Sequence, residues 1–140
     1  MKIAIIGEIH GDGWKILEKA DFQCFEVKNF EKKYLKEKLF NVDGIILRTA
    51  KFDAEVLKQC KKLKIVVRHG VGYDNVDLNY LNKNKIALGI TSTSNAVSVA
   101  EHVLTSFLYL AKNIHLSDKL TREGKFIEKT SLPNFFELYK

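Results

Sequence analysis

The sequence predicts an α/β fold: a doubly wound, mostly parallel sheet of five strands, followed by a long helix. The first observation is that short apolar runs alternate five times with amphipathic helical patterns along the chain. The second is that each connection is long enough for the crossover that parallel strands require. The third is that the single proline, Pro133, lies outside all of these segments.

The strands are expected over residues 2–7, 22–27, 44–47, 64–68 and 86–88. The first of them, Lys2–Gly7, is apolar without interruption from Ile3 to Ile6, which is typical of a strand buried on both faces. Strands of this kind that alternate with helices favour a sheet of flavodoxin-like size and topology.

Helices are expected over residues 11–20, 30–40, 54–60 and 78–81. In the first helix, the spacing of Trp14, Ile16 and Leu17 predicts that these three side chains face inward. Asp53 and Asp77 stand immediately before the third and fourth helical patterns, where an aspartate is a favourable N-cap.

A longer helix is expected over residues 95–116, where apolar side chains cover more than one face. A helix of this kind is normally buried by more than one partner surface. We therefore expect three parts: a flavodoxin-like domain over 1–94, the long helix over 95–116 that connects two domains, and a tail over 117–140. The tail ends on an apolar run, which suggests that it leads into a further element.

Composition excludes several classes of protein. The chain has 140 residues, of which 46% are hydrophobic and 29% charged, as in one globular domain. The net charge is +6, but only three of the 23 basic residues are arginine, and many lysines stand beside glutamate or aspartate. This pattern favours a solvated surface over a nucleic-acid interface.

The sequence also indicates the compartment. It shows neither a membrane span nor the pattern of a signal peptide. Cys24 and Cys60 are isolated thiols, with the spacing of neither a disulfide framework nor a metal site. We expect a protein of the reducing cytoplasm that binds no metal.

Two kinds of site, one for a dinucleotide and one for a phosphate group, would be located at strand ends in a fold of this type. Gly7, Gly11 and Gly13 follow the first strand, but their spacing is not that of the dinucleotide-binding pattern G-x-G-x-x-G. A response-regulator receiver domain would need a phosphate-accepting aspartate after the third strand, where Arg48 and Thr49 stand instead. Neither site is expected here.

The strongest signal is the segment Arg68-His69-Gly70-Val71-Gly72-Tyr73-Asp74-Asn75-Val76-Asp77, which follows the fourth strand. Ligands of doubly wound sheets bind at the carboxyl ends of strands. The N–H groups of Gly70, Val71 and Gly72 can therefore hold an anion such as a carboxylate. The alternative is a glycine-rich turn before a helix capped by Asp77.

Two further segments frame this one: Leu47-Arg48-Thr49-Ala50 and Asn95-Ala96-Val97-Ser98-Val99-Ala100-Glu101-His102. In this order and spacing, the three segments resemble the D-isomer-specific 2-hydroxyacid dehydrogenase family, which includes phosphoglycerate, glycerate and formate dehydrogenases. The first segment is more similar to phosphoglycerate dehydrogenases and the last to formate dehydrogenases, so the choice within the family stays open.

The resemblance implies roles for particular residues. The substrate-binding residues would be Arg48, Thr49, Gly70, Val71, Gly72 and Asn95. The Val71 and Gly72 amides would hold the substrate carboxylate, and Arg48 and Thr49 would approach the distal end of the substrate. Asn95 would lie near substrate and nicotinamide.

For other residues the resemblance implies less. The roles of Arg68 and His69 stay open, and Glu101 and His102 would serve domain packing. Val71 and Ser98 would be at most peripheral to the cofactor.

In this family the NAD(P)-binding domain and the catalytic arginine, glutamate and histidine follow these segments. None of the four histidines here, His10, His69, His102 and His115, is therefore expected to be the catalytic base. The expected function is the substrate-binding part of an NAD(P)-dependent dehydrogenase, inactive and without bound cofactor as this chain alone. The alternative is a non-catalytic module that binds carboxylates or dimerises. Expected partners are a small 2-hydroxy or 2-oxo acid and either a second copy or a separate NAD-binding chain.

Overall fold

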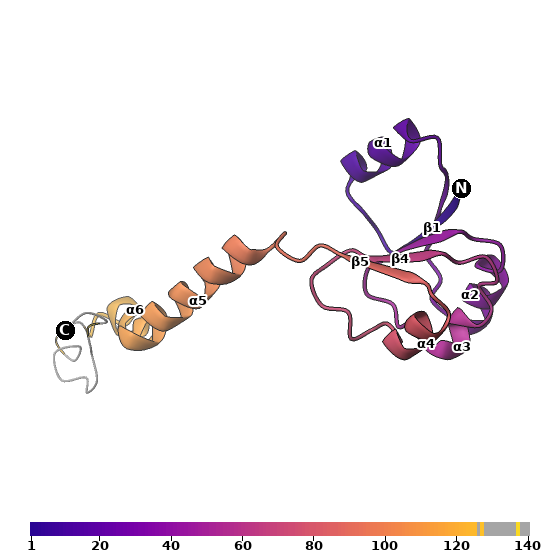
Figure 1. The fold of residues 1–140 in the computed structure, drawn as a ribbon. Coiled ribbons are helices and arrows are strands. Elements are labelled where there is room, and N and C mark those ends of the chain that lie inside the picture. The colour runs from indigo at the N-terminus through magenta and orange to yellow at the C-terminus, as the bar shows by residue number, and fades with distance from the viewer. Residues whose placement is uncertain (126, 128–136, 138–140) are drawn as a thin grey trace. The chain divides into compact units, whose positions relative to one another are not determined.

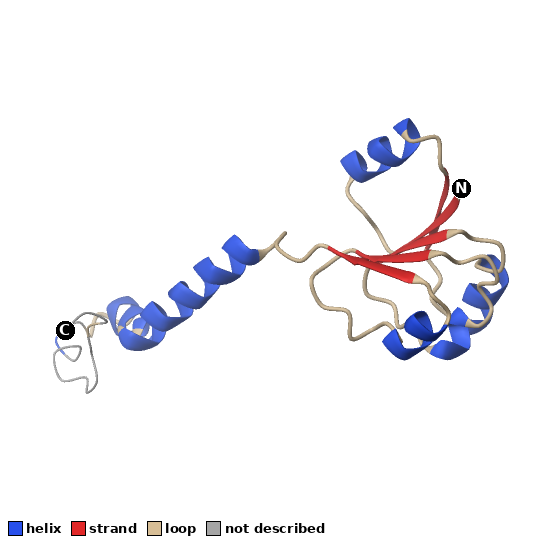
Figure 2. Cartoon of the chain, in the orientation of Figure 1, coloured by secondary structure: helices blue, strands red, loops and turns tan. Residues whose placement is uncertain are grey.

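The computed structural model describes residues 1–125, 127 and 137, and it confirms the α/β fold (Figure 1). Two compact units are present, residues 1–94 and residues 95–140. The first unit holds a parallel sheet in the order β2-β1-β3-β4-β5, drawn red in Figure 2. Its strands are β1 Lys2–Ile6, β2 Gln23–Val27, β3 Gly44–Leu47, β4 Ile65–Arg68 and β5 Ala87–Ile90.

The helices of the first unit are α1 Gly11–Lys19, α2 Lys32–Lys38, α3 Ala54–Leu57 and α4 Leu78–Lys83. Figure 1 shows α1 on one face of the sheet and the other three on the opposite face, so the sheet is doubly wound. The main core lies between the sheet and α2, α3 and α4. Its completely buried side chains include Ile6, Leu35, Leu47, Phe52 and Leu81.

The first helix departs from the sequence prediction. None of its residues is buried, and the Ile16 side chain is 67% exposed, whereas Trp14 and Leu17 are half-buried. In Figure 1, α1 is the only helix of the first unit on its face of the sheet. The inward position predicted for Ile16 is therefore wrong, because a helix with one neighbouring surface buries only a narrow stripe.

Both predicted aspartate caps are confirmed. Asp53 Oδ1 accepts the Val56 backbone N–H at 3.1 Å, and Asp77 Oδ1 accepts the Tyr80 backbone N–H at 2.9 Å. The bond with the Lys32 ammonium and that with the Val56 N–H hold the pKa of Asp53 below its ordinary value. These caps fix the starts of the two helices that follow the third and fourth strands.

The second unit begins with α5 Ala96–Ala111 and continues with α6 Ile114–Arg122. The helix expected over 95–116 is thus two helices, because Asn113 adopts a left-handed conformation with φ 48°. Asparagine tolerates this conformation better than most residues do, and it commonly ends helices there. The expected tail over 117–140 continues α6 at first, and its apolar end at 135–136 and 138–139 lies outside the described residues.

Within the described chain, α5 leaves most of its large apolar side chains exposed. They are Val97, Val99, Val103, Leu104, Phe107, Leu108, Tyr109 and Leu110. No helix among the described residues is both long enough and apolar enough to span a membrane.

Candidate functional site

The candidate site lies at the carboxyl ends of the parallel strands of the first unit, which we call the carboxyl edge of the sheet. Gly7 follows β1, Arg48 follows β3 and His69 follows β4, and the register pairs Ile6 with Leu47 and Leu47 with Arg68. These three chain turns therefore leave the sheet side by side. Residues 69–77, which we term the Gly70 loop, extend from this edge.

The first half of the Gly70 loop is tied to neighbouring strands. The His69 N–H donates to the Leu47 carbonyl at 2.8 Å, and the Gly70 carbonyl accepts the Thr91 N–H at 3.2 Å. The Arg68 guanidinium folds back onto the loop and donates to the His69 carbonyl. The Arg68 side chain, whose role the sequence left open, therefore has a hydrogen-bond partner within the loop.

Gly70 is required by this arrangement. Its φ is +151°, and a Cβ there would lie 2.8 Å from Arg68 Cζ and closer still to one guanidinium nitrogen. A side chain at this position would be strained by the backbone conformation, and it would also displace the end of the Arg68 side chain.

The second half of the loop is anchored to the segment that follows β3. Phe52 and Val76 form an isolated parallel bridge, with the Phe52 N–H on the Asn75 carbonyl at 2.7 Å and the Asp77 N–H on the Phe52 carbonyl at 3.0 Å. The Asn75 amide nitrogen donates to the Ala50 carbonyl at 2.8 Å. This role of Asn75 could not be predicted from the sequence, because its partner lies 25 residues away and no local pattern reveals it.

Between these two anchors, the loop presents unbonded donors. Within the described residues, no protein acceptor receives the backbone N–H of Val71 or that of Gly72. Val71 is 36% exposed and Gly72 is exposed, so both amides lie at the surface of a loop that is held at both ends. Successive backbone N–H groups in such a loop can bind an anion.

Arg48 and Thr49 are both exposed beside the loop. Arg48 Nη1 donates to the Glu8 carbonyl at 3.4 Å, and Arg48 Cβ would lie 3.1 Å from a Cβ at Gly7. Gly7 itself has φ +97°. The Arg48 side chain therefore crosses Gly7, which places a permanent cation at the edge of the sheet.

The remaining predicted site residues, Asn95 and Ser98, belong to the second unit. Asn95 precedes α5, its carbonyl accepts the Val99 N–H at 2.9 Å, and its side chain makes no capping bond. Ser98 is exposed in the first turn of α5. Within the first unit, Arg48, Thr49 and the Gly70 loop lie at one edge of the sheet.

The turn after β1 does not fit a dinucleotide. His10 Nδ1 accepts the Asp12 N–H at 3.3 Å, so the start of α1 is already occupied by a side chain. Glu8 and Asp12 also place carboxylates where the pyrophosphate would lie. A hollow of about 470 Å³ opens beside this turn, lined by Trp14 and Phe30 among others. Among the described residues, no group of His, Cys, Asp and Glu could hold a metal ion.

The fold and the loop define a class of protein: a doubly wound α/β domain with a loop of unbonded backbone N–H groups at the carboxyl ends of its strands. The particular family follows from comparison. Residues 3–138 match the family described as D-isomer specific 2-hydroxyacid dehydrogenase, catalytic domain, and the chain belongs to this family. The expected family is thereby confirmed.

The relatives are longer proteins. D-3-phosphoglycerate dehydrogenase of Archaeoglobus fulgidus is 29% identical over 130 residues, which are 92% of this chain and 25% of that protein. The PH0520 protein of Pyrococcus horikoshii OT3 is similar in structure, with a TM-score of 0.87, 27% identity and coverage of 99% and 43%. The NAD⁺-bound 3-phosphoglycerate dehydrogenase of Entamoeba histolytica has a TM-score of 0.69, 34% identity and coverage of 80% and 39%. The chain thus spans about a quarter of the first relative and less than half of the two structures.

Proposed function

We propose that these residues form the substrate-binding part of an NAD(P)-dependent D-2-hydroxyacid dehydrogenase, in which the Gly70 loop holds the carboxylate of a small 2-hydroxy or 2-oxo acid. The observation that carries the proposal is the pair of free, exposed N–H groups on Val71 and Gly72, in a loop anchored at both ends. Arg48 adds positive charge at the same edge of the sheet. The family membership supports this class of substrate.

The chemistry of the loop is binding and orientation. Two N–H donors that are fixed before the substrate arrives hold a carboxylate at little ordering cost. A carboxylate held in this way fixes the position of the adjacent carbon, which is where a 2-hydroxy acid is oxidised. Arg48 and Thr49 would then contact the far end of the substrate, and the family resemblance assigns a substrate contact to Asn95 as well.

The nicotinamide cofactor is assigned to residues outside the turn after β1, since His10 and the carboxylates there do not fit a pyrophosphate. The sequence contains no G-x-G-x-x-G pattern at its other glycines either. We therefore expect the chain by itself to turn over no 2-hydroxy acid with NAD or NADP. Micromolar NAD binding measured by calorimetry would overturn this part of the proposal.

The carboxylate site is tested by removing one donor. Val71→Pro deletes the Val71 N–H, whereas Val71→Ala keeps it and serves as the matched control. We expect binding of a 2-oxo acid, measured by calorimetry, to weaken about tenfold in Val71→Pro and to change little in Val71→Ala. Equal binding by both variants would contradict the role of this amide.

A second candidate is a module that assembles through α5. The large apolar side chains that α5 exposes in the described chain favour it, because a continuous apolar surface usually marks an interface. We propose a homodimer, or pairing with a separate NAD-binding chain. Light scattering at high protein concentration tests the homodimer: a dimer mass is expected that Leu104→Glu reduces to that of a monomer, and a monomer mass for the unaltered chain would refute it.

A further inference from the structure

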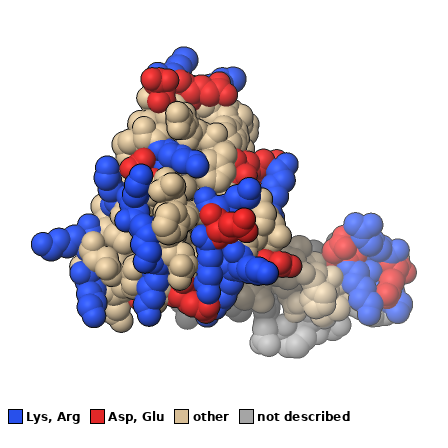
Figure 3. All heavy atoms as spheres, turned by 90° about the vertical axis from the view of Figure 1, so that its right-hand side faces the viewer, with Lys and Arg blue, Asp and Glu red and all other residues tan. Residues whose placement is uncertain are grey.

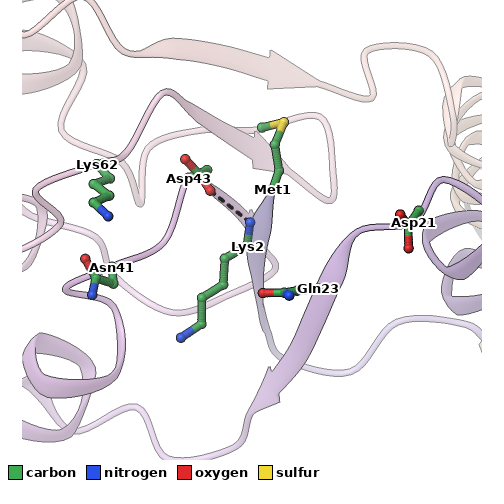
Figure 4. Close-up of a pocket in the computed structure, with 7 residues that line it drawn as sticks. All are labelled: Met1, Lys2, Asp21, Gln23, Asn41, Asp43 and Lys62. Atoms are coloured by element: carbon green, nitrogen blue, oxygen red, sulfur yellow. Dashed lines mark hydrogen bonds between the residues drawn. The ribbon is translucent and has the colours of Figure 1, made fainter.

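A polar hollow lies at the edge of the sheet opposite to the Gly70 loop, where the strands begin (Figure 4). Its volume is about 530 Å³, and its lining includes Lys2, Gln23, Asn41, Asp43 and Lys62. A second hollow of about 380 Å³ shares Lys2 and Gln23 with it and adds Lys38. We term these two together the amino-edge hollow. It takes no part in the proposed dehydrogenase site.

The Asp43 carboxylate in this hollow is already balanced. Its Oδ2 accepts the backbone N–H of Lys2 at 2.9 Å, and its Oδ1 lies 3.5 Å from Lys64 Nζ. The Lys2 N–H and the Lys64 ammonium hold the pKa of Asp43 below its ordinary value, so Asp43 is an anion with partners of its own. Asp43 therefore does not serve as a counter-ion for the Lys2 ammonium group.

The lysines that line the hollow are unpaired. Among residues 1–125, no carboxylate lies within ion-pair distance of Lys2, Lys38 or Lys62. By contrast, Lys32 and Lys36 on another part of the surface both pair with Glu55. Figure 3 shows the side of the molecule that lies to the right in Figure 1, and on this face blue basic side chains cover more area than red acidic ones.

Two of these ammonium groups lie over aromatic rings. Lys2 Nζ lies 5.2 Å from the centre of the Phe25 ring, and Lys38 Nζ lies 5.6 Å from the centre of the Tyr34 ring. Contacts of this kind attract the ammonium group to the face of the ring without neutralising it. The hollow therefore presents positive charge that has no carboxylate partner among residues 1–125.

A purely structural role accounts for only part of this pattern. Lys38 stands in the last turn of α2, where a cation stabilises the helix dipole. Lys2 begins a strand and Lys62 follows α3 in a turn, so neither belongs to a helix end. Gln23 and Asn41 add amide donors beside them, and Figure 4 shows the Asp21 carboxylate on the far side of Gln23 from Lys62.

We propose that the amino-edge hollow binds a small multivalent oxyanion, held by the ammonium groups of Lys2, Lys38 and Lys62 and by the side-chain amides of Gln23 and Asn41. An oxyanion with at least two charged groups fits, since the ammonium groups come from three separate chain segments. Phosphate and carboxylate groups share this chemistry. Because the hollow is at the opposite edge from the Gly70 loop, such a ligand would bind together with a substrate instead of competing with it.

The test is a titration of the ¹⁵N-labelled full chain with pyrophosphate, and in a second arm with citrate, at low ionic strength. We expect saturable shifts of the backbone amides of Lys2, Gln23 and Lys62 in both arms. The amides of Val71 and Gly72 should stay unmoved with pyrophosphate, whereas citrate is itself a 2-hydroxy acid and is also expected at the Gly70 loop. Saturation at the three amides of the hollow by both anions, or by pyrophosphate alone, supports the site, and the two results distinguish a general oxyanion site from a phosphate site. Saturable shifts by neither anion would overturn it.

The matched variants are Lys62→Gln in the hollow and Lys119→Gln in α6, which remove the same charge from exposed positions. We expect Lys62→Gln to weaken pyrophosphate binding at least about fivefold and Lys119→Gln less than about twofold. Equal weakening would show attraction to net charge alone and would overturn the proposal. Because the readout is anion binding at the amino edge, it is independent of whether the Gly70 loop binds a carboxylate.

Discussion

Gly70 combines two demands in one residue: a backbone with φ +151° and space for the Arg68 guanidinium. We predict that Gly70→Ala destabilises the chain by roughly 1–3 kcal/mol, since a side chain is strained at this φ and the end of the Arg68 side chain must move aside. It should also abolish binding of a 2-oxo acid, because the Val71 and Gly72 amides follow directly. Chemical denaturation and calorimetry measure the two effects.

Gly11→Ala is the control for this substitution. Gly11 begins α1, and nothing lies within 4 Å of where its Cβ would be. Alanine there should leave stability unchanged or raise it slightly, because it is the better helix former. If the two alanine variants proved equally stable, the strain assigned to a side chain at position 70 would be refuted.

Asn75 acts through one hydrogen bond, from its amide nitrogen to the Ala50 carbonyl at 2.8 Å. We predict that Asn75→Ala lowers the free energy of unfolding by about 1 kcal/mol, because the partly buried carbonyl loses its donor. The exposed Asn79 in α4 provides the control, and Asn79→Ala should have no destabilising effect. Faster hydrogen exchange at the Phe52 amide in Asn75→Ala would place the loss at the loop anchor.

At the scale of elements, an ion pair links α2 to the residue that caps α3. Lys32 Nζ lies 2.8 Å from Asp53 Oδ2, and this bond holds the pKa of Asp53 low. A carboxyl whose pKa is lower in the folded chain stabilises the fold above its unfolded pKa of about 3.9. That contribution is lost as the pH falls from there through the folded value.

The matching variant is Asp53→Asn, which retains the helix cap but removes the charge. We predict that it is less stable than the unaltered chain at pH 7 and that the difference closes below the folded pKa of Asp53. Urea denaturation at a series of pH values measures this difference. A gap that stays constant from pH 7 to pH 2 would show that the Lys32 pair contributes nothing.

The positions of the strands and helices could be predicted from the sequence more reliably than the burial of the side chains on them. The periods of the apolar runs located the strands, and aspartate before a helical pattern located the starts of α3 and α4. The exposure of Ile16 could not be predicted in this way, because it depends on what else lies on that face of the sheet. The helix break at Asn113 was not predicted, although asparagine favours such a break, because the apolar pattern continues on both sides of it.

In the candidate site, too, some residues could be predicted from the sequence and others could not. The glycines of the Gly70 loop and the resemblance to a family pointed to Val71 and Gly72 directly. The supports of the loop, the Arg68 bond to the His69 carbonyl and the Asn75 bond to Ala50, needed coordinates. Asn75 and its partner are neighbours only because β3 and β4 are adjacent and parallel, which is a property of the sheet.

At the scale of the whole molecule, the main core belongs to one unit. Every residue of the core cluster lies between Ala4 and Leu81, and the strand pairs extend to Ile90. A sheet of five strands with helices on both faces in 94 residues has the size of an independent domain. The second unit, in its described part, buries only Ala111 and Leu120.

We therefore predict that residues 1–94 alone fold cooperatively, with a free energy of unfolding within about 1 kcal/mol of that of the full chain's first transition. Urea denaturation followed by the fluorescence of Trp14, the single tryptophan, makes the comparison. Residues 1–85 form the control, because they lack β5 and leave the edge of β4 unpaired, and this shorter chain should not fold. If 1–94 were also unfolded, the independence of the first unit would be refuted.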